Sequence, residues 1–177
     1  MSRSARRAVV VSLALAVSAC AAEPAPGPVT YDLGARPVRA GEQALKVSPA
    51  RNGDTEFTLI GLTSAIPTIT GSHAEFNAKG KFTRIRLVVT GTGLSTVLFD
   101  ARRQQLVLDG GAVADPDQQA MTIKRQPDKF DLGPTVRVEF DLYYDIAKDA
   151  KPVALRAFGG PTLIDVKNLT GTDIKLA

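Results

Sequence analysis

The sequence predicts an all-β domain, an antiparallel β-sandwich over residues 41–177. Three observations favour this fold class. Apolar residues beyond residue 41 recur mostly at every second position, which is the period of a half-buried strand. Turn-forming residues such as the Asn52-Gly53 pair separate the apolar runs. No eleven-residue window after the first twenty residues carries a sustained helical stripe, so we do not expect helices to build the core.

The strand candidates are short and follow one another at spacings typical of a sandwich. In chain order they cover residues 56–62, 82–90, 95–99, 105–108, 135–143, 153–158 and 162–166. Two of them alternate most clearly, and the apolar side chains of one face then form the core. The predicted core comprises Ile85, Leu87, Val89, Val136, Val138, Phe140 and Leu142.

The alternate positions of the same two strands are mostly charged. Arg84 and Arg86 lie on the first strand, and Arg137, Glu139 and Asp141 lie on the second. If the strands are neighbours, Arg86 and Glu139 pair across the sheet for about 0.2–1 kcal/mol. We therefore expect a solvated outer face that is a poor surface for recognition.

The first nineteen residues have the anatomy of a signal peptide. Residues 1–7 (MSRSARR) are basic, and residues 8–17 (AVVVSLALAV) are largely apolar. Ten helical residues rise about 15 Å, half the hydrocarbon thickness, so this stretch is too short for a stable span. Residues 17–20 (VSAC) match the bacterial lipobox, in which the cysteine receives a diacylglycerol thioether. We expect cleavage before Cys20 and a lipid-anchored, extracytoplasmic protein; the alternative is a plain secretory signal with Cys20 near the cut by chance.

Residues 20–40 are expected to form a lipid-anchored linker. Pro24, Pro26, Pro28 and Pro37 disfavour helices and sheet ladders and favour extended polyproline II. At about 3 Å per extended residue, the nineteen residues after the cysteine can lift the domain by about 55 Å. We expect this segment to be a spacer with no other role.

The composition excludes several classes of function. The chain has 177 residues, with 22 Lys and Arg, 18 Asp and Glu, one His and one Cys. One His and one Cys cannot form a four-ligand zinc site or a disulfide framework, and we expect no metal and no cofactor. The formal charge of +4 includes three arginines of the signal peptide; without them, 19 basic residues face 18 acidic ones. Since the basic residues are scattered, nucleic acid is not an expected partner.

Two short motifs could carry chemistry, and both have simpler explanations. His73 follows Ser72, but neighbours on an extended chain point to opposite sides and cannot form a nucleophile–base pair. We expect a solvated loop histidine. Asp115 and Asp117 have metal-like spacing, but calcium takes about six to eight oxygen ligands and no third acid with a glycine turn follows. Turn-forming carboxylates beside Pro116 are the preferred interpretation.

The two longest segments without a strand pattern, 64–78 and 113–134, form the candidate partner surface. Loops of this length are uncommon in compact domains unless they are functional or disordered. We expect some of their apolar residues to cover the open end of the sandwich and the remainder to form the largest exposed apolar patch. Tyr143 and Tyr144 adjoin at a strand end, so one is expected to be buried and the other exposed. The possible partner surface comprises Ile66, Ile69, Phe76, Met121, Phe130 and Tyr144.

Residues 80–93 (GKFTRIRLVVTGTG) resemble a segment of the telokin-like immunoglobulin domain of unknown function, which is common in secreted lipoproteins of Gram-positive bacteria. The likeness continues through residues 106–111 (LVLDGG), 136–143 and 145–152, and it covers about residues 41–166 in the same order. That domain is similar in shape to an actinobacterial secreted immunogenic antigen family. The resemblance implies an immunoglobulin-like sandwich on a lipid anchor and supplies no catalytic residues.

These observations favour a membrane-anchored cell-envelope lipoprotein that acts as a non-catalytic binding module, because sandwiches present loops and edge strands to partners. The expected partners are membrane lipid, through acylated Cys20, and a protein or other envelope component. Two alternatives remain open. One is an extracytoplasmic enzyme whose carboxylates are assembled by the fold, and the other is a purely structural or immunogenic surface protein.

Overall fold

The structure is a computed structural model that describes residues 36–72, 74–162, 164 and 170–177. The elements in chain order are β1 (Gln43–Ala44), β2 (Ala50–Asn52), β3 (Thr55–Thr70), β4 (Glu75–Gly91), β5 (Val97–Asp100), η1 (Ala101–Arg103), β6 (Gln105–Leu108), η2 (Asp109–Gly111), β7 (Val113–Ala114), α1 (Gln118–Ile123), β8 (Lys129–Leu132), β9 (Arg137–Ile146), β10 (Pro152–Ala157) and β11 (Thr172–Lys175). The predicted signal peptide, Cys20, most of the predicted linker and His73 lie outside the described residues. Residues 36–40 of that linker contact the sandwich and belong to the folded domain.

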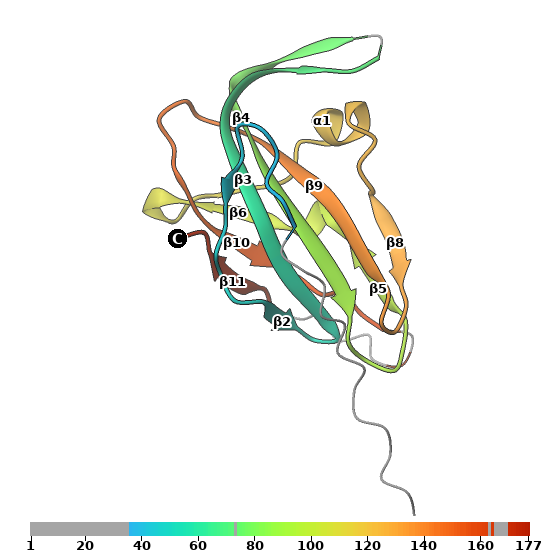
Figure 1. The fold of residues 1–177 in the computed structure, drawn as a ribbon. Helices are drawn as coiled ribbons and strands as arrows, with labels where there is room; N and C mark the ends of the chain where they lie inside the picture. The colour runs from blue at the N-terminus through green and yellow to red at the C-terminus, as the bar shows by residue number, and fades with distance from the viewer. Residues whose placement is uncertain (1–35, 73, 163, 165–169) are drawn as a thin grey trace, which may run out of the picture. The chain divides into compact units, whose positions relative to one another are not determined.

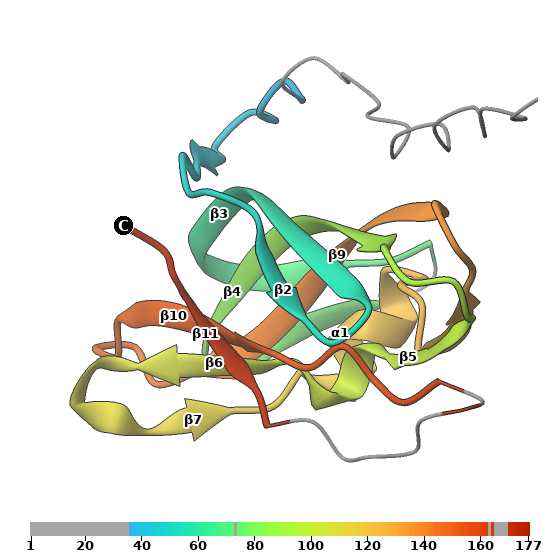
Figure 2. The ribbon, with the colours of Figure 1, turned by 90° about the horizontal axis from the view of Figure 1, so that it is seen from below.

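The predicted all-β, antiparallel architecture is confirmed, with two sheets and a two-stranded ribbon around one core (Figures 1 and 2). Within the described residues, the larger sheet has the strand order β1-β3-β4-β9, with β2 also paired to β3. The second sheet has the order β11-β10-β6-β7, and the ribbon pairs β5 with β8. Figure 2 shows the larger sheet above the second sheet, with α1 and β5 toward one side.

The predicted core is confirmed except at one position. Five of the seven predicted side chains are buried and one is half-buried: Ile85, Leu87, Val89, Phe140 and Leu142, with Val138. The prediction that Val136 is buried is wrong, because its side chain is 44% exposed. Val136 precedes β9 in a tight turn, where its N–H donates to the Gly133 carbonyl at 3.2 Å. It therefore lies beyond the strand and outside the space between the layers.

The segment 64–78, predicted to be irregular, is instead the outer half of the long β3–β4 hairpin. Three register shifts between residues 59 and 68 interrupt the period-two pattern, which is why the sequence does not show a strand there. The bulged hairpin bends over α1 and closes one end of the sandwich (Figure 1). Lys124, just after α1, fixes the hairpin by donating from Nζ to the Thr70 carbonyl at 2.7 Å.

The segment 113–134 is also more regular than predicted, since it contains β7, α1 and β8. Asp117 caps α1 by accepting the Ala120 N–H at 2.8 Å. The residues around the helix also protect the edge of β9, because Gln126 Oε1 accepts the Asp141 N–H at 2.7 Å. An edge strand whose donors are satisfied in this way does not offer a template for further strands.

The last strand lies later in the chain than predicted. Of the predicted strand 162–166, Thr162 forms an isolated bridge to Val97, and most of the remaining residues lie outside the described chain. The second sheet is completed by β11, which pairs with β10. The predicted turn at Asn52 is confirmed, and its side chain joins distant segments by donating to the Thr170 carbonyl at 2.7 Å and accepting the Gly159 N–H at 2.8 Å.

Candidate partner-binding surface

The six residues predicted to form a partner surface do not form an exposed apolar patch. Ile69, Met121 and Tyr144 are buried, and Ile66, Phe76 and Phe130 are half-buried against the core. The prediction is therefore wrong for the first three. The bent hairpin also turns Phe76 toward the core, where its ring lies 5.5 Å from the Phe82 ring. The expectation that apolar residues of these segments cover the open end of the sandwich is confirmed instead.

Tyr143 and Tyr144 are both buried, so the prediction that one is exposed is wrong. Tyr144 faces the core, where its hydroxyl donates to the Gln104 carbonyl at 3.0 Å. Burial raises the pKa of Tyr144 well above its ordinary value of 10.0. Tyr143 faces the other side of the sheet, where burial and the nearby Asp141 raise its pKa against the opposing effect of Arg84. The outer face of the sheet is therefore covered as well.

The cover is formed by residues 36–44, which we call the N-terminal strap. It lies on the outer face of β4 and β9 and is held largely by charge. Arg39 Nη1 lies 2.6 Å from Asp141 Oδ2. The predicted pair of Arg86 with Glu139 is confirmed at 3.3 Å, but the Arg86 side chain is only 6% exposed. The expectation of a solvated outer face is wrong, because the strap excludes water from its centre.

Glu42 forms the innermost contacts of the strap. Its carboxylate is fully buried and lies 2.8 Å from Arg86 Nη2 and 3.5 Å from Arg84 Nη2. Gly61 leaves room for it, because a Cβ at that position would lie 2.4 Å from Glu42 Cγ and Cδ. The Nε atoms of both arginines and Oδ1 of Asp141 are buried without a hydrogen-bond partner. The ion pairs of Glu42 with Arg84 and Arg86 therefore offset the free-energy cost of removing these charges from water and add little net stability.

The candidate acidic residues support the fold, and Asp117 lines one surface hollow together with Asp145. Asp117 caps α1, and Asp115 accepts a side-chain amide at 3.1 Å. Asp145 accepts two backbone N–H groups of β4, at 2.7 and 3.1 Å. Within the described ranges, no three His, Cys, Asp or Glu side chains are grouped so that they could hold a metal ion.

The described part of the chain also contains no helix that is long and apolar enough to cross a bilayer.

A surface hollow of about 650 Å³ lies beside the β5–β8 ribbon, and we call it the β5–β8 groove. It is lined by Leu98, Phe99, Asp100, Arg103, Lys129, Phe130, Asp131 and Pro161. The apolar wall is Leu98, which is 44% exposed and whose N–H donates to the Pro161 carbonyl at 2.8 Å. Cross-strand pairing sets Asp131 opposite Leu98 and Lys129 opposite Asp100. The groove thus combines an apolar strip with charges of both signs.

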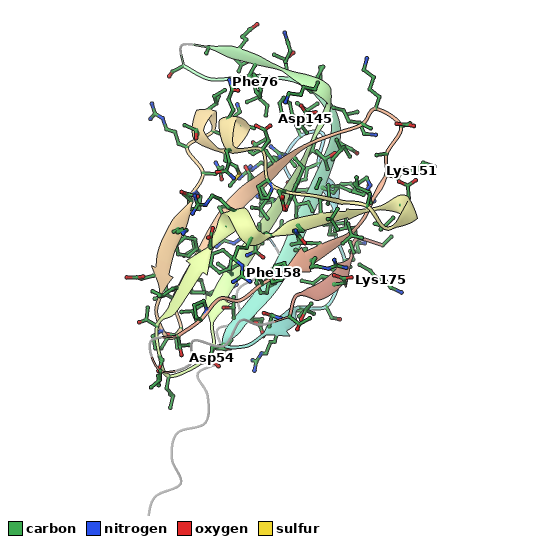
Figure 3. All side chains as sticks on the ribbon, turned by 180° about the vertical axis from the view of Figure 1, so that it is seen from behind. Asp54, Phe76, Asp145, Lys151, Phe158 and Lys175 are labelled. Atoms are coloured by element: carbon green, nitrogen blue, oxygen red, sulfur yellow. The ribbon has the colours of Figure 1, made fainter. Side chains whose placement is uncertain are left out.

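Arg103 forms one wall of the groove, and its orientation is fixed by an aromatic contact. Its guanidinium lies 5.0 Å from the centroid of the Phe158 ring, which Figure 3 labels. An arginine held in this way presents its charge at a defined place, which favours recognition over a freely moving side chain.

Sequence reasoning missed the groove because its walls come from four segments: β5, η1, β8 and the residues after β10. One local signal was available. Leu98 lies between Val97 and Phe99, which both face the core, so that an apolar side chain occupies an outward position. Such a break in alternation indicates an apolar residue that the core does not require.

Comparison with known proteins supports the fold. No protein-family model and no curated protein matches the chain, so the resemblance to the telokin-like domain is not confirmed by a family match. The solved structure of the yjhA protein from Bacillus subtilis is similar, with a TM-score of 0.56, 15% identity and coverage of 73% of this chain and 97% of that one. A conserved hypothetical protein from Bacillus anthracis has a TM-score of 0.53 and 10% identity over 77% and 96% of the two chains. MPT63, a secreted protein from Mycobacterium tuberculosis, has a TM-score of 0.43 and 10% identity over 73% and 95%.

Proposed function

We propose that the protein is a lipid-anchored, extracytoplasmic binding module of the bacterial cell envelope. The observation that carries the proposal is the order of two parts in one chain: a lipobox at residues 17–20, then a sandwich with an amphipathic surface groove. Each buried CH₂ of an acyl chain contributes about 0.8 kcal/mol, so two or three chains on Cys20 would hold the protein on the membrane.

A binding role is favoured over catalysis at Asp100, an acidic residue of the groove that already has structural partners. Asp100 caps η1 by accepting the Arg102 N–H at 3.0 Å, and its other oxygen lies 3.5 Å from Lys129 Nζ. A general acid or base needs an oxygen that is free to exchange a proton with a substrate. Asp100, held on both oxygens, suits a structural role better.

The groove suits a segment of another protein. An apolar strip at Leu98 and Pro161 lies between the charged Arg103, Lys129 and Asp131. An apolar centre with a charged rim is the usual anatomy of a protein interface. Among the described residues, β8 pairs only with β5, so an extended partner segment could also pair with its outer edge.

Anchoring is tested by the variant Cys20→Ala in the producing bacterium. We expect the wild-type protein in the membrane fraction, with Cys20 carrying acyl chains in the mass spectrum. The variant should remain as an uncleaved precursor or leave the membrane. A processed variant that stays in the membrane fraction would contradict the lipid anchor.

Binding is tested with a photo-cross-linking amino acid at Leu98 in the anchored protein, in its native envelope. The matched control is Val113 on β7, which is 45% exposed against 44% for Leu98. We expect a discrete cross-linked product from Leu98 alone, and less of it in Lys129→Glu. Equal products from both positions, or none from Leu98, would show that the groove is not the binding surface.

A further inference from the structure

The outer edge of β8, which we call the β8 edge, has no partner strand in the described part of the chain. Along its other side, β8 (Lys129–Leu132) pairs with β5. Figure 1 shows β8 at the rim of the sandwich. An unpaired edge presents a row of backbone N–H and C=O groups with which another strand can pair. The β8 edge can therefore accept one more strand.

The pairing with β5 shows where the backbone groups of Asp131 point. Asp131 lies opposite Leu98 in the β5–β8 ribbon. The Leu98 N–H donates away from β8, to the Pro161 carbonyl at 2.8 Å. Residues directly opposite each other in an antiparallel pair either exchange both hydrogen bonds or both point their backbone groups away. The N–H and C=O of Asp131 therefore point to the β8 edge.

The backbone groups of Lys129 follow the same pattern. Lys129 lies opposite Asp100, two residues further along both strands, and the two kinds of cross-strand pair alternate. The Asp100 carbonyl accordingly accepts Gln104 Nε2 at 2.9 Å, on the side away from β8. The N–H and C=O of Lys129 therefore point to the β8 edge as well. This edge presents the backbone groups of one basic and one acidic residue.

The side chains of Lys129 and Asp131 share one exposed face, because alternate residues of a strand point to the same side. The Lys129 side chain is 61% exposed, and its Nζ lies 3.5 Å from Asp100 Oδ2. Asp131 is exposed, and it forms no ion pair with any described residue. The β8 edge thus carries one positive and one negative charge, two residues apart.

These charges are complementary to those of a second copy of the same strand. In an antiparallel pair with Phe130 at a two-fold axis, Lys129 lies opposite the partner's Asp131, and Asp131 lies opposite the partner's Lys129. The backbone groups of these residues face each other in this register, so hydrogen bonds and ion pairs form at the same positions. An axis at Lys129 or at Asp131 would place like charges opposite each other, which is destabilising. Charge therefore selects one register, and a second copy of the chain as the occupant.

Two prolines limit the length of this contact. Pro127 precedes β8 by two residues and Pro134 follows it by two, and proline has no N–H to donate. The pairing is therefore confined to residues 128–133. So short a contact buries less than the roughly 1,200–2,000 Å² of a stable interface, and we expect a dissociation constant of about 10 μM to 1 mM. Because a two-fold contact uses the β8 edge of both copies, it closes at two chains.

We propose that two copies of the protein pair through the β8 edge and form a two-fold symmetric dimer. The β5–β8 ribbons of the two copies then form one continuous sheet. In that sheet Lys129 lies between Asp100 of its own chain and the partner's Asp131, so it contributes to both contacts. The inference does not depend on the proposed lipid anchor. The exposed face with Leu98 stays open to the partner of the proposed binding role, since the pairing uses only the strand edge.

The test measures association of the full chain, purified as the bacterium produces it, by sedimentation equilibrium in density-matched detergent. Lys129→Glu leaves two acids at the β8 edge, and Asp131→Lys leaves two bases. Each variant alone therefore places like charges opposite each other. An equimolar mixture of the two variants places unlike charges opposite each other again. The matched control is Lys175→Glu, which makes the same change of charge at an exposed residue of β11.

We expect the wild-type protein to dimerise over a concentration series from about 10 to 500 μM. Each variant alone should associate about ten-fold more weakly or less, since two cross-strand pairs change from attraction to repulsion. The mixture should associate within about three-fold of the wild type, which would also show that both variants are folded. Lys175→Glu should associate like the wild type.

A wild-type protein that stays monomeric over this series would overturn the dimer and leave the proposed binding role intact. If Lys129→Glu then also loses the Leu98 cross-link, the β8 edge belongs to a segment of another protein. A dimer that persists in both variants would indicate another surface or a shared micelle, and would overturn the proposal as well. So would a loss of association that the mixture does not restore. An absent Leu98 cross-link beside a dimer that follows these charges would contradict only the proposed binding surface.

Discussion

The two faces of the β4–β9 pair have opposite chemistry and reach similar burial by different means. On the inner face, Leu87 and Phe140 are apolar and lie in the core between the layers. On the outer face, Arg86 and Asp141 are charged, yet each is only 5% exposed because the N-terminal strap lies over them. Alternation therefore predicts which side of a sheet a residue faces, but not whether that side is covered.

Burial has opposite energetic consequences on the two faces. Removing an apolar side chain from water contributes about 1.5–3 kcal/mol to stability. Removing a charge from water costs free energy that an ion pair must offset. We therefore expect any loss of side-chain volume on the inner face to lower the free energy of unfolding. On the outer face, we expect a large loss of stability mainly when one member of a buried ion pair is replaced and the other is left in place.

The largest effect is expected at Phe140 on the inner face. Its ring lies 6.0 Å from those of Phe99 and Phe130, so Phe140→Ala leaves a cavity among aromatic side chains. We expect a loss of about 3–5 kcal/mol in the free energy of unfolding, measured by urea denaturation. Val136→Ala is the control, and it should change stability by less than about 0.5 kcal/mol. A loss below about 1 kcal/mol for Phe140→Ala would mean that the core is loosely packed there.

The next effect is expected at Glu42 on the outer face. Glu42→Gln removes the closer of the two carboxylates that pair with the buried Arg86, and breaking a buried pair typically costs about 3–5 kcal/mol. We expect the lower end of this range, because Glu139, which lies 3.3 Å from Arg86 Nη1, remains in the variant. Replacing Glu42 by Leu and Arg86 by Met together should restore most of the stability. If the double variant is as unstable as Glu42→Gln, loss of packing and not the unpaired charge is the cause.

The contrast between the faces also explains what could be predicted from the sequence. The strands of the inner face were predictable because period-two alternation at Ile85, Leu87, Phe140 and Leu142 is a local pattern. The cover on the outer face was not, since it depends on residues 36–44, more than forty positions away, of which residues 36–40 belong to the predicted proline-containing linker. Whether a sheet face is covered or exposed depends on contacts between segments that are far apart in the sequence.

The candidate site was harder to predict than the fold for the same reason. Register shifts in the β3–β4 hairpin interrupt the alternation of its strands, so the sequence predicts a surface loop for Ile69 and Phe76. Of the residues that line the groove, only Phe130 belongs to the predicted partner surface, because Leu98, Arg103 and Lys129 come together with it only after folding. The lipobox can be recognised from the sequence because it is a contiguous motif that does not depend on the folded structure.

A third prediction compares the adjacent tyrosines of the two faces at alkaline pH. Burial raises the pKa of both, and that of Tyr144 is raised further. A group whose pKa is raised by folding contributes its full stability below its unfolded value, here 10.0, and loses it as pH rises. We therefore expect the protein to lose stability above pH 10.0, followed as the urea midpoint against pH.

The variants identify which tyrosine causes that loss. Tyr144→Phe should cost about 1 kcal/mol at neutral pH, because the Gln104 carbonyl loses its donor. Tyr144→Phe should also reduce the fall of the urea midpoint at alkaline pH more than Tyr143→Phe does. An equal decline in both variants would mean that neither phenol controls the transition and that lysine deprotonation dominates.

The smallest effect is expected from an ion pair that has the chemistry of Glu42 and Arg86 but lies in water. Arg156 binds Asp173 through two hydrogen bonds of 2.7 and 2.9 Å, and the side chains are 36% and 46% exposed. The hydrogen bond with Arg156 lowers the pKa of Asp173 below its ordinary value of 3.8, so its contribution is present above that pH and lost as pH falls. Because water solvates both groups when they separate, Asp173→Asn should leave the urea midpoint at neutral pH unchanged within error. A carboxyl titration by NMR should still show the lowered pKa, and a destabilisation as large as that of Glu42→Gln would mean that burial is not what distinguishes the two pairs.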